Sequence, residues 1–239
     1  MAAALLWSGT MLARFVVFFF LLSGSALAQV EWEDTRLSPF VAVVDLQVPR
    51  NAQREFHRAN EFMIRQNWTK AIEKLHRATA IYPDYAAAYN NLAVAYERMG
   101  DEKQERGALG KAISLNDHFA LAYVNLSRLS MADNDFRQAE TLLERASALD
   151  PTDATTLSLL AYAQFMDQHP DNALTTCRKA HDMSQAHAFV HRIAARVYEQ
   201  KNRLSEASAE LRTFLNEEPR GSRAESARQE LAILHSLGR

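Results

Sequence analysis

Cysteine, glycine and proline are all scarce in this chain of 239 residues, which has one cysteine, seven glycines and six prolines. A single cysteine excludes an internal disulfide and any metal site built from several thiolates. So few turn-forming residues argue against a β-sandwich or a β-barrel, because those folds need frequent Gly/Pro turns. The composition therefore favours a helical fold.

An excess of charge of one sign is also missing. The 27 Lys and Arg residues are balanced by 29 Asp and Glu residues, and the formal net charge is −2. A nucleic-acid-binding surface needs a basic patch, so we expect no nucleic-acid partner. Alanine, by contrast, is abundant, at roughly one residue in six, which is typical of closely packed helices.

The longest apolar run, FVVFFFLL at residues 15–22, follows Arg14 and precedes the small residues Ala26 and Ala28. This order is typical of a secretory signal peptide, which we expect at residues 1–28, with Met11 as an alternative start. The run to Ala28 is shorter than the roughly 20 residues of a spanning helix. We expect an exported, periplasmic or secreted protein. An uncleaved inner-membrane anchor at residues 15–28 is the main alternative, with membrane contact only in that case, and a cytoplasmic protein is a further one.

Residue types recur every 34 positions from residue 52 to residue 221. Four columns of the repeat carry small or apolar residues at every position except Glu105: Ala59, Ala93, Ser127, Ala161 and Ala195; Ala71, Glu105, Ala139, Ala173 and Ala207; Leu75, Leu109, Leu143, Cys177 and Leu211; Ala78, Ala112, Ala146, Ala180 and Phe214. This spacing predicts five copies, at 52–85, 86–119, 120–153, 154–187 and 188–221. Ala71, Leu75 and Ala78 are spaced as one stripe of an α-helix, so each copy is expected to be a helix–turn–helix hairpin that buries its apolar face only by stacking.

The repeats resemble the tetratricopeptide repeat family. The residues that carry the resemblance are Tyr89, Leu92, Ala93, Tyr96, Leu109 and Ala112 in the second copy, and Tyr123, Leu126, Ala139, Leu143, Ala146 and Pro151 in the third. The resemblance implies an all-α, right-handed α-solenoid. Arg58, Glu105 and Phe214 depart from the family pattern.

Residues on either side of the repeats have different patterns. Residues 29–51 include the β-branched stretch from Phe40 to Val48 and are expected to be extended. Residues 222–239 begin with the capping box Ser222 to Glu225, followed by an apolar stripe, which predicts a final helix that closes the array.

No signature of a catalytic site occurs in the mature chain, so we expect no enzyme activity and no cofactor. Cys177 occupies an apolar column and is expected to be buried. His187 and His191, with His181 nearby, have a spacing that can suit zinc. Since His191 shares a column with Tyr89 and Tyr123, packing is the preferred interpretation and no metal is expected.

Binding of a protein or peptide is then the expected function. In the family, the first helix of each hairpin lines a concave groove. The resemblance assigns to that groove Asn60, Asn91, Val94, Asn125, Arg128, Met131, Tyr162, Phe165, Arg192 and Arg196.

These residue types suggest what the groove would take. Asparagine side chains both donate to and accept from a peptide backbone, and arginines beside apolar residues suit hydrophobic and acidic side chains. Exposure and helix packing are both open for Tyr162 and Phe165. The expected role is a non-enzymatic scaffold of the cell envelope. The alternative is a structural subunit that uses the convex face or the Phe40–Val48 segment.

Expression of the full chain in a bacterium with a Sec pathway tests the signal peptide. The chain should lose residues 1–28 and leave the cytoplasm, since its N-terminal pattern fits a cleavable signal. N-terminal sequencing is expected to begin at Gln29. A sequence that begins at Met1 or Met11 would contradict this expectation.

Overall fold

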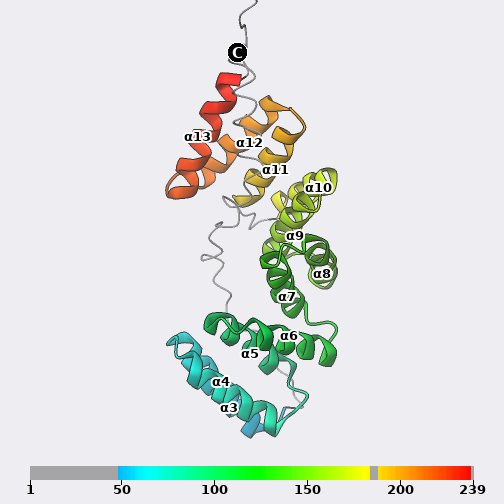
Figure 1. The fold of residues 1–239 in the computed structure, drawn as a ribbon, viewed down its shortest axis with the longest axis vertical. Helices are drawn as coiled ribbons and strands as arrows, with labels where there is room; N and C mark the ends of the chain where they lie inside the picture. Colours follow the sequence, from blue (N-terminus) through cyan, green and yellow to red (C-terminus); the bar gives the residue numbers. More distant parts are fainter. Residues whose placement is uncertain (1–47, 184–187, 238–239) are drawn as a thin grey trace, which may run out of the picture. The chain divides into compact units, whose positions relative to one another are not determined.

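The computed structural model describes residues 48–183 and 188–237, which form eleven α-helices and no strand (Figure 1). The helices are α3 (Arg50–Ile64), α4 (Trp68–Ile81), α5 (Ala86–Met99), α6 (Glu102–Leu115), α7 (Ala120–Ala132), α8 (Phe136–Leu149), α9 (Ala154–Met166), α10 (Pro170–His181), α11 (Phe189–Gln200), α12 (Leu204–Glu217) and α13 (Ser222–Leu237). The predicted signal peptide, residues 29–47 and His187 lie outside the described residues.

Consecutive helices form five hairpins, which pair α3 with α4, α5 with α6, α7 with α8, α9 with α10, and α11 with α12. The second helix of each hairpin also packs on the first helix of the next, and α12 packs on α13. The predicted fold class is confirmed as an all-α solenoid of five paired-helix units and a closing helix. None of the eleven helices is both long and apolar enough to cross a membrane.

Each hairpin bends at a residue in the left-handed conformation, and these residues recur every 34 positions. They are Gln66, Gly100, Asn134, Gln168 and Asn202, with φ between 55° and 73°. Glycine and asparagine adopt this conformation readily, whereas glutamine seldom does. The period of the side chains is therefore present in the backbone too.

The start of α3 differs from the prediction. Arg50 and Asn51, expected in the extended segment, belong to the helix. The reason is local, because the carbonyl of Pro49 accepts the first helical hydrogen bond from the amide of Gln53 at 3.0 Å. Val48 is buried just before the helix, and its carbonyl accepts a bond from Gln53 Nε2 at 2.9 Å.

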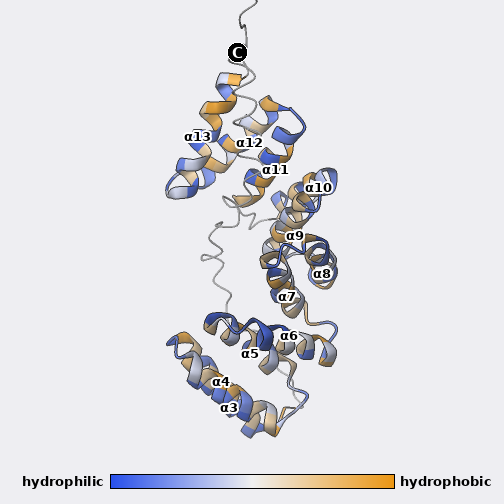
Figure 2. Ribbon diagram, in the orientation of Figure 1, coloured by the Kyte–Doolittle hydropathy of each residue, from blue (hydrophilic) through white to orange (hydrophobic). Residues whose placement is uncertain are grey.

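The repeat columns supply much of the buried core. Eight alanines of two columns are fully buried: Ala71, Ala78, Ala112, Ala139, Ala146, Ala173, Ala180 and Ala207. Leu75, Leu109, Leu143 and Leu211 are also fully buried, and Cys177 is buried as expected. Figure 2 shows hydrophobic and hydrophilic residues mixed along the helices, as expected where each helix buries one side.

The closing helix α13 buries Ala227 and Leu234 against α11 and α12, with Leu231 packed beside them. Phe214, the largest departure from its alanine column, is fully buried in this same cluster. The apolar stripe predicted for residues 222–239 therefore covers the last hairpin.

Replacing Ala139 or Ala173 with leucine tests the alanine columns. Each side chain has no exposed surface, so added bulk should lower the free energy of unfolding by about 1–3 kcal/mol. Thermal unfolding followed by circular dichroism measures the change. The matched control is Ala80→Leu, at an exposed position of α4, which should leave the midpoint nearly unchanged. Equal midpoints for all three variants would sink the assigned helix register.

Candidate partner-binding surface

Four asparagines form a chain of hydrogen bonds across the first helices of three consecutive hairpins. Asn125 Nδ2 on α7 donates to Asn90 Oδ1 on α5 at 2.9 Å. Asn90 Nδ2 donates to Asn91 Oδ1 at 3.4 Å, and Asn91 Nδ2 donates to Asn60 Oδ1 on α3 at 2.8 Å. All four side chains are buried. We call Asn60, Asn90, Asn91 and Asn125 the asparagine ladder.

The asparagine ladder changes the interpretation of three predicted site residues. Asn60, Asn91 and Asn125 were expected to face a peptide, but their amides join neighbouring repeats. Asn90, which joins Asn91 to Asn125, is not among the predicted site residues. The sequence spacing gives a signal for these bonds, because both separations are close to the 34-residue period. Asn60 and Asn91 are 31 residues apart, and Asn90 and Asn125 are 35 residues apart.

Arg128 on α7 lies in a cluster of charged groups instead of standing alone in a groove. Its Nη2 is 4.0 Å from Glu97 Oε1, and its side chain is only 17% exposed. Burial lowers the pKa of Arg128. Burial, with the neighbouring carboxylates of Glu97 and Glu102, raises the pKa of Glu105 to about 7. The nearby carboxylate of Glu97 therefore offsets part of the positive potential of Arg128, whereas Glu105 contributes less negative charge than an ordinary glutamate.

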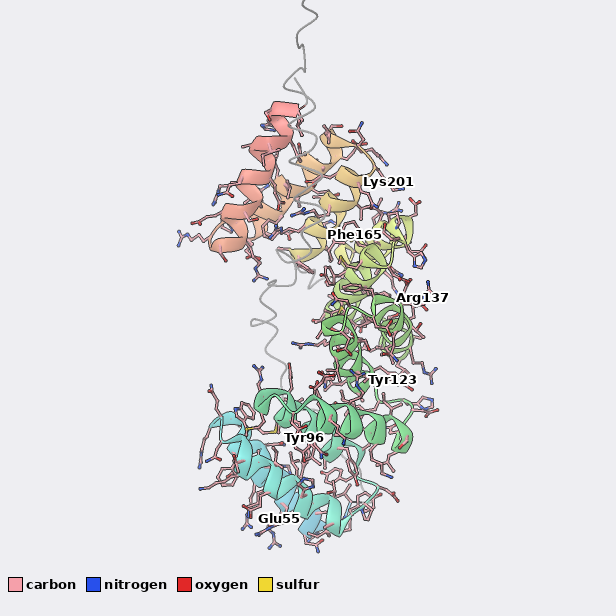
Figure 3. The ribbon with its side chains drawn as sticks, viewed as in Figure 1. Glu55, Tyr96, Tyr123, Arg137, Phe165 and Lys201 are labelled. Atoms are coloured by element: carbon pink, nitrogen blue, oxygen red, sulfur yellow. The ribbon has the colours of Figure 1, made fainter. Side chains whose placement is uncertain are left out.

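The apolar members of the predicted site divide between core and surface. Met131 and Tyr162 are buried, while Val94 and Phe165 are half-buried (Phe165 is labelled on α9 in Figure 3). The Tyr162 ring packs between Phe136 and Phe189, with centroids 6.1 and 6.2 Å away. Burial also raises the pKa of its hydroxyl. Packing is therefore the role of Tyr162, and only Val94 and Phe165 keep partial access.

Arg192 and Arg196 on α11 bind a carboxylate of the chain itself. Their Nη2 atoms lie 3.0 and 2.7 Å from the same Glu230 oxygen, Oε1, on α13. The guanidinium of Arg192 also lies over the Phe214 ring, 5.6 Å from its centroid. All three charged side chains are less than a fifth exposed. The pairing of arginine with carboxylate was anticipated, but its partner is the closing helix.

A cavity of about 230 Å³ opens where the connections between the first three hairpins come together. Tyr82, Asp84 and Tyr85 line it from the α4–α5 connection, and Asn116 and Phe119 line it from the α6–α7 connection. Tyr82 and Asn116 are one period apart, as are Tyr85 and Phe119. The cavity is a candidate site that was not predicted. Tyr85 and Phe119 are aromatic at the same repeat position in the first two copies, which marks the place but does not by itself predict a cavity.

Sequence profiles of known families match the same part of the chain. A profile described as TPR repeat matches residues 59–100, and one described as Tetratricopeptide repeat matches residues 86–119. A profile for subunit 3 of the anaphase-promoting complex, or cyclosome, matches residues 132–214. These matches fall on the described hairpins. The chain is a tetratricopeptide repeat (TPR) protein. No curated protein sequence matches it.

Solved structures of other proteins share the fold. MamA residues 41 to the end, from Desulfovibrio magneticus RS-1, has a TM-score of 0.65 and 16% identity over 72% of this chain and 97% of its own. PilF of Pseudomonas aeruginosa has a TM-score of 0.64 and 18% identity over 79% of this chain and 89% of its own. YrrB is described as a TPR protein with an unusual peptide-binding site. It has a TM-score of 0.63 and 18% identity over 73% of this chain and 90% of its own. At these identities the likeness shows the fold alone.

Replacing Arg192 and Arg196 together with alanine should destabilise the TPR array. Glu230 would stay nearly covered without its two donors, so the free energy of unfolding should fall by about 2–3 kcal/mol. Urea titration of the helical circular dichroism signal measures this loss. The matched control replaces Arg58 and Arg77, whose pairs with Glu55 and Glu73 leave both arginines more than half exposed. The control should lose less than about 1 kcal/mol per pair, and an equal loss in both variants would contradict the assignment.

Proposed function

We propose that this TPR protein is a non-enzymatic scaffold of the cell envelope that binds a peptide segment or a partner protein. The fold supports the binding part, because TPR arrays present helical surfaces to other proteins. The solved structure of YrrB, with a similar fold, is described as having a peptide-binding site. The envelope part rests on the signal-peptide pattern of residues 1–28.

The cavity between the first hairpin connections is the observation that carries the proposed site. Its aromatic wall suits an apolar side chain of the partner, while the exposed carboxylate of Asp84 and the amide of Asn116 can bond polar groups beside it. A volume of about 230 Å³ is several times the roughly 30 Å³ share of one water molecule, so a side chain fits. The side chains of the asparagine ladder and of Arg192 and Arg196 already have partners within the chain. We therefore assign binding of the partner to the cavity.

Exposed apolar residues favour a second candidate function, that of a permanent subunit of an envelope complex. Ile64 and Met99, at the C-terminal ends of α3 and α5, are 61% and 54% exposed. Both helices are the first of their hairpins, so neighbouring repeats present an apolar side chain at the same end. Contact with a stable partner would remove this surface from water.

A capture experiment tests the cavity. The purified chain is immobilised, incubated with an envelope extract of the cells that produce it, and washed, and the retained proteins are identified by mass spectrometry. Asp84→Arg places a long cation at the mouth of the cavity and should abolish retention of the specific partner. Thr152→Arg is the matched control, since it places the same long cation at the equivalent repeat position two copies later, and it should retain the partner.

Both variants change exposed positions, so their helical spectra should match the parent. Retention of the same partner by both variants would move the binding site away from the cavity. A partner that stays bound at equal stoichiometry through high-salt washes, and is lost when Ile64 and Met99 become serine, would favour the permanent subunit.

A further inference from the structure

His191 on α11 has one ring nitrogen bonded and one that lacks a hydrogen-bond partner. Its Nδ1 is 2.7 Å from Glu210 Oε2 on α12. Its Nε2 is buried and makes no hydrogen bond of good geometry, and Glu217 Oε1 lies at ion-pair distance from it, 3.4 Å away. The side chain is only 7% exposed. A buried polar atom without a partner is costly unless it has a task.

Two further metal-ligating side chains face the same place. His181, the last residue of α10, lies with its ring 5.0 Å from the His191 ring, centroid to centroid, at an interplanar angle of 76°. Glu217 is the last residue of α12. One ligand atom from each of His181, His191 and Glu217 lies within 4.8 Å of the other two. Three helices therefore bring two imidazoles and a carboxylate together.

We propose that His181, His191 and Glu217 form a binding site for a divalent transition-metal ion of the zinc class. Zinc takes imidazole nitrogen and carboxylate oxygen at about 2.0–2.2 Å, and two histidines with one glutamate leave its fourth position open to water. Tetrahedral ligands at that length are about 3.3 Å apart. His181 and Glu217 are exposed, so rotation of their side chains closes the remaining distance to the fixed His191.

Glu210 supports the proposed site through its bond to the other ring nitrogen of His191. A carboxylate that accepts the Nδ1 proton of a histidine fixes the tautomer whose Nε2 offers a lone pair, and such carboxylates accompany metal-bound histidines. The Glu210–His191 bond therefore orients the unpartnered nitrogen toward the other two ligands. The competing explanation is an imidazolium that carries both protons between Glu210 and Glu217, and it predicts no metal binding.

A second cluster in the described residues serves as a comparison. Glu140, Asp167 and His169 also place ligand atoms within 4.8 Å of one another. There, however, His169 Nδ1 already bonds Glu140 at 2.8 Å, its side chain is half exposed, and no buried nitrogen lacks a partner. This cluster is a half-exposed histidine bonded to a buried carboxylate, and it supplies the matched control.

Isothermal titration of zinc chloride into the purified chain, made without a polyhistidine tag and cleared of metal by a chelator, tests the site. At about pH 8, above the ordinary range of imidazole, the parent should bind one ion, although Glu210 and then Glu217 raise the pKa of His191 and so make a proton compete with the metal. His181→Ala and Glu217→Gln change exposed side chains and should remove this binding while the helical spectrum stays unchanged. Glu210→Gln should weaken it about 10–100-fold. His169→Ala should bind as the parent does.

Thermal unfolding gives a second measurement. An ion that binds only the folded chain stabilises it, so zinc should raise the midpoint of the parent and of His169→Ala but not that of His181→Ala. Absence of zinc binding by the parent would overturn the proposal in favour of the imidazolium. Binding that survives in His181→Ala or disappears in His169→Ala would place the ion elsewhere and overturn it too. None of these outcomes depends on partner capture, so the proposed scaffold function stands or falls separately.

Discussion

Helices whose facing side chains are single methyl groups can approach more closely than helices that face each other with leucine or phenylalanine. Eight alanines in two repeat columns have no exposed surface here, and the leucine column fills the space beside them. One hairpin alone leaves an apolar face in water, so each copy needs a neighbour. Phe214 occurs in the fifth copy, where it packs against α13, and there a large side chain fits.

Polar groups inside the array hold the first helices in register with one another. Apolar contacts tolerate small shifts between helices, whereas an amide bond such as Asn91 to Asn60 at 2.8 Å requires one alignment. Since the asparagine ladder is buried, a shifted array would leave amides unpaired at about 1–3 kcal/mol each. Glu230 fixes the alignment of α13 on α11 in a similar way, because one of its carboxylate oxygens binds two arginines of α11.

The 34-residue period was enough to predict the hairpins, because the buried columns depend on local helix geometry and stacking, and the capping box with its apolar stripe was enough to predict the closing helix. The direction of polar side chains was not predictable in the same way. Asn90 and Asn91 are adjacent in sequence but bond in opposite directions along the array, which depends on how neighbouring helices align. Likewise, Arg192 binds Glu230, which lies 38 positions further along the chain. His181, His191 and Glu217 come from three different helices. The cavity depends on two connections meeting, which no single column reveals.

The left-handed turn residues bear on how the array comes apart. Gln66, in the bend of the first hairpin, holds a conformation that costs about 1 kcal/mol or more for an ordinary side chain. That cost falls within one hairpin and lowers its own stability, while the asparagine ladder adds to the coupling between hairpins. In a linear array, weak units with strong coupling lose structure together, whereas strong units with weak coupling fray one at a time. The placement of strain inside the hairpins and of amide bonds between them therefore favours cooperative unfolding of the first three repeats.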